Sequence, residues 1–141
     1  MISSGPLEDR LAIRELVESY NDAVMRFDPE DWGANWADDG IWSLPGRGEV
    51  EGRDKIVPFW TAVMSNIEVD GFFASGGVLT VVGDTAHGTW YQQEFLRDKP
   101  QGDAAVTKRF VIGEYTDDYV KRDGRWLFAK RVYKVRTMET R

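Results

Sequence analysis

The chain has 141 residues, of which 42% are hydrophobic and 13% aromatic, which is enough for one globular domain with a real core. Its formal net charge of -6 argues against a nucleic-acid partner, because phosphate binding requires clustered lysine and arginine. The absence of cysteine excludes disulfides, thiolate metal sites and a cysteine nucleophile, and no run approaches the roughly 20 apolar residues that span a membrane.

The first predicted element is an amphipathic helix. Apolar residues from Leu7 to Phe27 recur at steps of three to five residues, which marks one buried helix face. Pro6 suits the first turn of this helix, whereas Pro29 ends it and pushes Asp28 out of helical geometry.

Two further helices are expected before the main part of the sheet. Residues 30–38 are predicted to form a short helix that includes Trp36, and residues 41–44 a brief strand after it. The segment 45–52 is turn-rich, and a third helix is predicted over residues 53–65.

From residue 68 onward the pattern changes to strands. Gly76-Gly77 is expected to separate the first two strands, and Asp123-Gly124 is a strong signal for a two-residue hairpin turn. Helices followed by a long antiparallel sheet give the α+β class, and the whole chain, residues 1–141, is predicted to be a single domain. The strands are predicted at residues 68–75, 78–83, 85–97, 106–121 and 125–136.

The order of several short motifs resembles the SnoaL-like group of the nuclear transport factor 2-like superfamily. This group includes scytalone dehydratase, ketosteroid isomerase, limonene epoxide hydrolase and polyketide cyclases. The resemblance implies a cone, in which a curved, mixed but mostly antiparallel sheet is closed by three N-terminal helices around a pocket. The motifs are Tyr20 with Phe27-Asp28-Pro29-Glu30-Asp31-Trp32, Trp36-Ala37-Asp38-Asp39, Gly83-Asp84-Thr85-Ala86, Gly113-Glu114-Tyr115 and Asp123-Gly124-Arg125-Trp126.

Three residues are candidates for catalysis, each with a structural alternative. The resemblance places Asp28 at the pocket aspartate of scytalone dehydratase, where Trp90 could donate to it, whereas the structural alternative makes Asp28 the cap of the second helix. Tyr20 falls on the tyrosine that donates to the enolate in ketosteroid isomerase, or it is a core tyrosine. Glu114 is a second acid or a surface charge. Strand alternation sets His87, the only histidine, on the face opposite Trp90.

The catalytic pattern of these enzymes is incomplete in this chain. The two tyrosines that hold the catalytic water in scytalone dehydratase correspond to Phe27 and Trp42, and the general base of ketosteroid isomerase corresponds to Leu44. Aromatic residues are core by default, but an aromatic-lined cavity also suits a flat apolar ligand. The candidate substrate-binding residues are Phe27, Trp42, Trp60, Phe73, Trp90 and Phe110.

We therefore expect a cofactor-independent lyase or isomerase that acts on a small hydrophobic cyclic or aromatic substrate by acid/base chemistry. The alternative is a non-catalytic protein that binds a hydrophobic small molecule, or a dimeric accessory protein of the same fold. No signal peptide is visible, and the absence of cysteine fits the expected cytoplasmic protein. A homodimer is expected from the resemblance and from a sheet face that carries Tyr115, Tyr119 and Tyr133.

Overall fold

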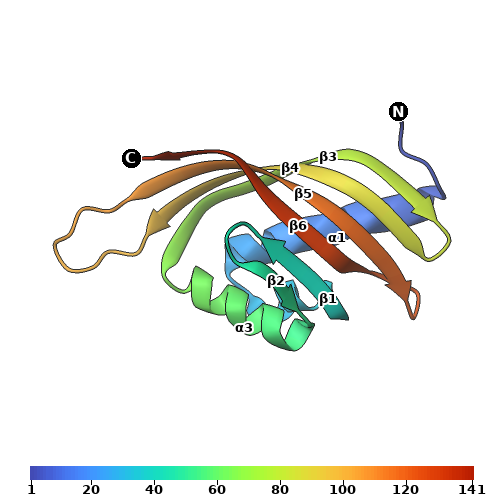
Figure 1. Ribbon diagram of the computed structural model, residues 1–141, viewed down its shortest axis with the longest axis horizontal. Coiled ribbons are helices and arrows are strands. Elements are labelled where there is room, and N and C mark those ends of the chain that lie inside the picture. Colours follow the sequence, from blue (N-terminus) through green and yellow to red (C-terminus); the bar gives the residue numbers. More distant parts are fainter.

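The computed structural model describes residues 1–141 and sets three helices against a six-stranded sheet (Figure 1). None of the helices combines the length and the apolar character that crossing a membrane requires. The helices are α1 (Leu7–Arg26), α2 (Pro29–Gly33) and α3 (Arg53–Met64). The strands are β1 (Trp36–Leu44), β2 (Gly48–Glu51), β3 (Ile67–Val82), β4 (Thr85–Asp98), β5 (Lys108–Arg122) and β6 (Arg125–Thr140).

The strands follow the order β2-β1-β6-β5-β4-β3, so the sheet is open and has β2 and β3 at its edges. Neighbouring strands run antiparallel, except that β1 and β6 are parallel. Figure 1 shows the long strands β3 to β6 curving over α1. The predicted α+β class and mostly antiparallel sheet are confirmed. The three helices, however, do not all precede the sheet, because β1 and β2 lie between α2 and α3.

The segment predicted as one helix over residues 30–38 is divided between a helix and a strand. Helix α2 is only five residues long, and β1 begins at Trp36, which pairs with Phe128 of β6. A register shift between Trp36 and Ile41 carries β1 through Gly40. A Cβ atom at Gly40 would lie 3.0 Å from the Trp36 ring, so this glycine makes room within a strand and does not end a helix.

Two strand predictions also change. The segment expected to be only turn-rich contains β2, which forms an antiparallel hairpin with β1. The strands predicted at residues 68–75 and 78–83 are one continuous strand, β3, with a register shift between Gly76 and Leu79. A Cβ atom at Gly76 would lie 2.4 Å from the guanidinium of Arg14 on α1, so glycine here admits the helix and does not interrupt the strand.

Aromatic rings hold the helices to the sheet. Trp32 of α2 stacks on Trp60 of α3, with ring centroids 4.4 Å apart and planes 8° apart. Tyr20 of α1 packs edge-on against Phe128 of β6, with centroids 5.4 Å apart. Burial of such large rings supplies much of the hydrophobic stabilisation of a core. The helices are therefore fixed in place above the inner face of the sheet.

The tyrosines that suggested a dimer surface lie on the inner face of the sheet. Tyr115 and Tyr119 are buried, and Tyr133 packs against Tyr115 with ring centroids 4.8 Å apart. That basis for a dimer is wrong, because strand alternation turns these side chains toward the helices. The homodimer itself stays a prediction. The outer face exposes other aromatic side chains, among them Phe73 and Tyr91.

The hairpin between β5 and β6 turns at Asp123-Gly124, as predicted, with positive φ angles of 52° and 75°. We expect Gly124→Ala to lower the free energy of unfolding by about 1 kcal/mol, because a Cβ atom disfavours this backbone conformation. Chemical denaturation measures the change. Asp123→Asn is the matched control and should be nearly neutral, because asparagine tolerates the left-handed region. Equal stability of Gly124→Ala and the wild type would contradict the expectation.

Candidate active site

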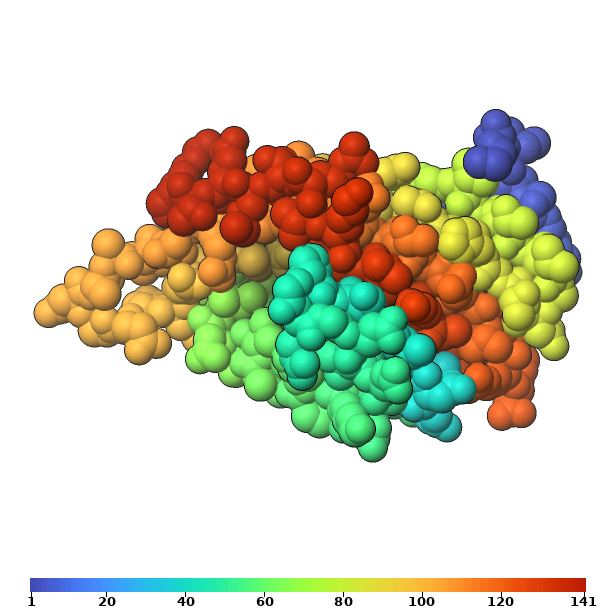
Figure 2. Space-filling view, viewed as in Figure 1, coloured from blue at the N-terminus to red at the C-terminus, as the bar shows by residue number.

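A cavity of about 400 Å³ lies between the helices and the inner face of the sheet, and 14 of its 17 lining residues are hydrophobic. Figure 2 shows the hollow between the β1–β2 hairpin, the start of β3 and the C-terminal part of β6. The volume is typical of small-molecule sites. No three His, Cys, Asp or Glu side chains of the protein gather into a group that could hold a metal ion. The charged lining residues are Arg47 and Glu94, and three of the hydrophobic ones, Tyr20, Tyr115 and Tyr133, also carry a hydroxyl group.

A short chain of hydrogen bonds positions the one carboxyl group of this cavity, that of Glu94. The Tyr133 hydroxyl donates to Oε1 of Gln92 at 3.1 Å, and Nε2 of Gln92 donates to Oε2 of Glu94 at 3.1 Å. Gln92 and Glu94 point inward because they are two residues apart on β4. The amide of Gln92, which is fully buried, therefore orients the carboxyl group toward the cavity.

Gly113 of β5 makes this arrangement possible. A Cβ atom at Gly113 would lie 2.6 Å from the Tyr133 hydroxyl and 2.8 Å from Oε1 of Gln92. Gly113 faces Gln92 on one side and Val135 of β6 on the other. The missing side chain leaves the space in which Tyr133 and Gln92 meet.

The surroundings of Glu94 make it a proton acceptor suited to neutral pH. Burial among apolar groups raises the pKa of Glu94 from 4.5 to about 7, while the hydrogen bond from Gln92 and the charge of Arg109 oppose the shift. A carboxyl group with a pKa near the working pH can take up and return a proton in one reaction cycle.

A buried ion pair lies beneath the tyrosines of the cavity. Arg131 of β6 bonds Asp117 of β5 through two nitrogens, at 2.8 and 3.0 Å, and both side chains are fully buried. The guanidinium lies 3.7 Å from the ring centroid of Tyr115 and 4.5 Å from that of Tyr20. This cation–π contact fixes both rings at the wall of the cavity.

The cavity tyrosines are available as proton donors. Burial raises the pKa of Tyr20 and of Tyr115 above the ordinary value, and the charge of Arg131 opposes part of the shift. Both hydroxyls therefore keep their protons at neutral pH. The prediction that Tyr20 is a pocket residue agrees with its place in the cavity lining.

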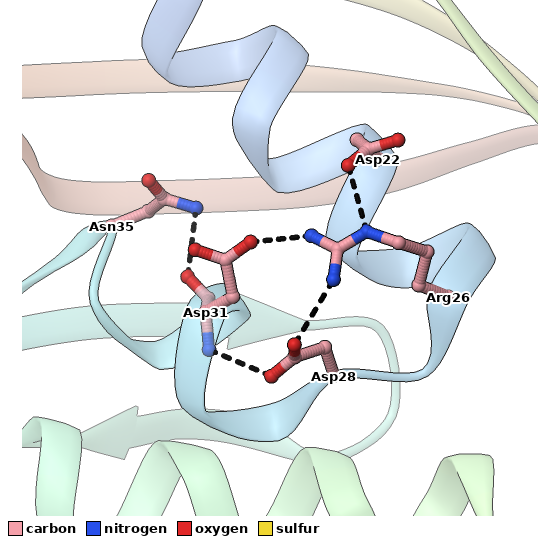
Figure 3. Close-up of polar contacts among 5 residues, drawn as sticks. All are labelled: Asp22, Arg26, Asp28, Asp31 and Asn35. Carbon is pink, nitrogen blue, oxygen red and sulfur yellow. Dashed lines mark hydrogen bonds and ion pairs between the residues drawn. The ribbon is translucent and has the colours of Figure 1, made fainter.

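Asp28, by contrast, does not line the cavity. Its Oδ1 atom accepts a hydrogen bond from the Asp31 amide at 3.0 Å, which makes Asp28 the N-cap of α2. Figure 3 shows Arg26 held by Asp22, Asp28 and Asp31 at the junction of α1 and α2. The Asp31 amide and the Arg26 guanidinium lower the pKa of Asp28, so this carboxylate is a weak base. The structure therefore agrees with the alternative in which Asp28 caps the second helix.

The other polar candidates lie away from the cavity. Glu114 is on the outer face of β5, where Arg136 donates to it at 2.7 Å. His87 is also on the outer face and bonds Asp118 at 2.8 Å. The indole of Trp90 donates to the Tyr119 hydroxyl at 2.9 Å and not to Asp28. The structure therefore brings neither Asp28 nor Glu114 to Tyr20.

Of the six aromatic residues predicted to bind substrate, two line the cavity and four do not. Trp42 and Trp60 line the cavity. Phe27 is partly exposed and packs against Trp60, with ring centroids 5.7 Å apart. Phe73 is exposed, and Phe110 packs against the exposed Phe95 at 4.8 Å, so both lie outside the cavity. Trp90 belongs to the core and not to the lining.

Glu94 is the main residue that the sequence analysis missed. A signal was present: once Trp90 is set on the inner face, alternation along β4 also turns Gln92 and Glu94 inward. The sequence analysis placed Tyr115 and Tyr133 together on one face of the sheet, but on a face proposed for dimer contact. The structure places both in the lining of the cavity.

Comparisons with known proteins agree with this fold. A family model described as a SnoaL-like domain matches residues 5–132. The gamma-hexachlorocyclohexane dehydrochlorinase of Sphingobium indicum is 25% identical over 138 residues, which cover 87% of this chain and 80% of that protein. A crystal structure of a type 2 hexachlorocyclohexane dehydrochlorinase has a TM-score of 0.80 at 21% identity, covering 96% of this chain and 90% of that chain. A ketosteroid isomerase-like protein from Erwinia carotovora atroseptica has a TM-score of 0.77 at 19% identity, covering 94% and 99%.

The role of Asp28 as a cap can be tested by substitution. We expect Asp28→Ala to lower the melting temperature by roughly 3 °C, because the Asp31 amide loses its acceptor. Asp28→Asn should keep most of the stability, because asparagine caps helices equally well. Thermal unfolding measures both variants. An unchanged melting temperature in Asp28→Ala would contradict the assignment.

The raised pKa of Glu94 predicts how stability depends on pH. The folded protein binds this proton more tightly than the unfolded chain does, since the pKa rises from 4.5 to about 7. The stabilisation from Glu94 is therefore complete below the unfolded value and is lost as the pH rises through the folded value. Relative to Glu94→Gln, the wild type should lose stability between about pH 5 and about pH 8, as measured by denaturation. Parallel pH curves would contradict this.

Proposed function

Since the chain belongs to the SnoaL-like domain family, we propose that it is a cofactor-independent lyase or isomerase. Its substrate is a small hydrophobic cyclic or aromatic molecule that occupies the cavity of about 400 Å³. The observation that carries the proposal is the inward carboxyl group of Glu94, whose pKa is raised to about 7 by apolar surroundings. A dehydrochlorinase among the relatives supports the elimination class.

Glu94 is the general base in this proposal. Its carboxylate takes a proton from a ring carbon, and the electron pair of the broken C–H bond forms a carbon–carbon double bond. In a lyase reaction this pair expels a leaving group from the neighbouring carbon. In an isomerase reaction the electrons move onto a carbonyl oxygen, and protonated Glu94 then returns the proton to another carbon.

The tyrosines stabilise the negative charge that develops during proton removal. Tyr20 and Tyr115 line the same cavity as Glu94 and keep their protons at neutral pH. A hydroxyl that donates to a developing oxyanion in a water-poor site lowers the barrier more than it does in water. Tyr20 keeps the donor role expected for it, whereas Asp28 and Glu114 take no part because they lie outside the cavity.

The test is turnover of a panel of cyclic ketones and of rings that carry hydroxyl or halogen leaving groups. We expect Glu94→Gln to lower kcat/KM by about 100-fold or more, and Tyr20→Phe to lower it by about tenfold. The kcat/KM of the wild type should rise with pH through about 7, because the base must be ionised.

The matched control is Glu114→Gln, which removes a carboxylate on the outer face and should leave kcat/KM unchanged. If Glu94→Gln turns the ligands over as the wild type does, acid/base catalysis by Glu94 is excluded. If the wild type binds members of the panel but turns none of them over, the non-catalytic alternative, binding of a hydrophobic molecule, describes the cavity.

A further inference from the structure

Arg47 is the one basic residue in the lining of the cavity. It lies in the hairpin turn between β1 and β2, directly after Pro45-Gly46. Its guanidinium carbon is 5.0 Å from the ring centroid of Phe59, which also lines the cavity. The arginine is therefore held at the mouth of the cavity by a cation–π contact.

The guanidinium of Arg47 has no partner within the protein. Every other arginine of the chain donates at least one side-chain hydrogen bond to a protein atom. Glu49, an acidic residue on the same hairpin, accepts a hydrogen bond from Lys130 at 3.2 Å. The positive charge of Arg47 is thus not neutralised by an ion pair.

Arg47 and Glu94 lie on opposite sides of the same end of the cavity. Leu44 is adjacent to the position of Tyr133, because Ser43 pairs with Val132 in the parallel pair β1–β6. Tyr133 is also level with Trp90 of β4, because both pair with Tyr115 of β5. Strands β1, β6 and β4 run in the same direction, and Arg47 and Glu94 follow Leu44 and Trp90 in the chain, so both lie toward the same end of the sheet. Strands β6 and β5 separate β1 from β4, which gives a backbone separation of about 14 Å.

From this placement we infer that the substrate carries an anionic oxygen group, a carboxylate, which binds Arg47 while its ring lies against Glu94 and the tyrosines. The inference rests on the proposed function and adds the substrate class. A guanidinium presents a planar fork of N–H donors that matches a carboxylate bidentately. The guanidinium of Arg47 lies over the ring of Phe59 and donates no hydrogen bond to a protein atom, so its N–H groups remain free to bind a carboxylate.

The charges of the cavity also assign an orientation. A carboxylate next to Glu94 would repel its ionised form, whereas a carboxylate at the mouth meets an unpaired cation. The apolar middle of the cavity, which includes Trp42 and Leu44, fits the ring. Arg47 is therefore a specificity-determining residue that selects ring compounds with an acidic substituent.

Binding of two nearly isosteric probes, 2-naphthoate and neutral 2-naphthamide, tests the inference. Isothermal titration calorimetry at about pH 6 keeps Glu94 largely protonated and the naphthoate ionised. We expect the wild type to bind 2-naphthoate about tenfold more tightly than 2-naphthamide. Arg47→Gln should bind both probes equally, with its affinity for 2-naphthamide unchanged. Arg47→Lys should keep part of the preference, because it retains the charge but not the fork.

The matched control is Arg136→Gln, which removes an arginine of the outer face and should keep the full preference. Three results would overturn the inference: equal affinities in the wild type, a preference that persists in Arg47→Gln, or no binding of either probe. Glu94→Gln separates this inference from the proposed function. If that variant keeps both turnover and the preference for naphthoate, the catalytic proposal fails and the substrate class stands.

Discussion

The arrangement of the cavity depends on the buried ion pair of Arg131 and Asp117. These residues face each other across β5 and β6, fully out of contact with solvent. Removing one partner of such a pair costs about 3–5 kcal/mol, because the other charge is left uncompensated in the core. Asp117 also accepts from the Tyr119 hydroxyl at 2.7 Å, and the guanidinium contacts the rings of Tyr20 and Tyr115. One pair thus joins α1 to the sheet and sets the tyrosine wall.

The cavity also requires an alternation of large and absent side chains on the inner face. Tyr115, which is buried, alternates along β5 with Gly113, which provides the space for Tyr133 and Gln92. A packed core normally fills such space because voids forfeit dispersion contacts. The space here is filled by the polar contact of Tyr133 with Gln92, which holds the inward carboxyl group of Glu94, and the volume beside that group stays open.

Much of the fold could be predicted because its signals are local. The first helix, the β5–β6 hairpin and the long strands follow from periodicity and turn residues within a few positions. Trp36 was assigned wrongly because its spacing from Trp32 fits a helix face, and only the pairing with Phe128, distant in the sequence, decides for a strand. Asp28 stands at the sequence position expected for a pocket aspartate, but its carboxylate binds the Asp31 amide and so does not point into the cavity. Glutamate is usually a surface residue, so the residue type at position 94 gave no indication that its side chain is buried.

The orientation of Gln92 has a stereochemical consequence. Its amide oxygen accepts from Tyr133 and its nitrogen donates to Oε2 of Glu94, so Oε1 is the carboxyl oxygen that stays free. A flat ring between the sheet and the helices presents only one of its two faces to this atom. In the proposed isomerase reaction, a proton that Glu94 removes and returns would therefore leave and arrive on that same face. The handedness of the product would then be set by Gln92, a residue that does not itself line the cavity.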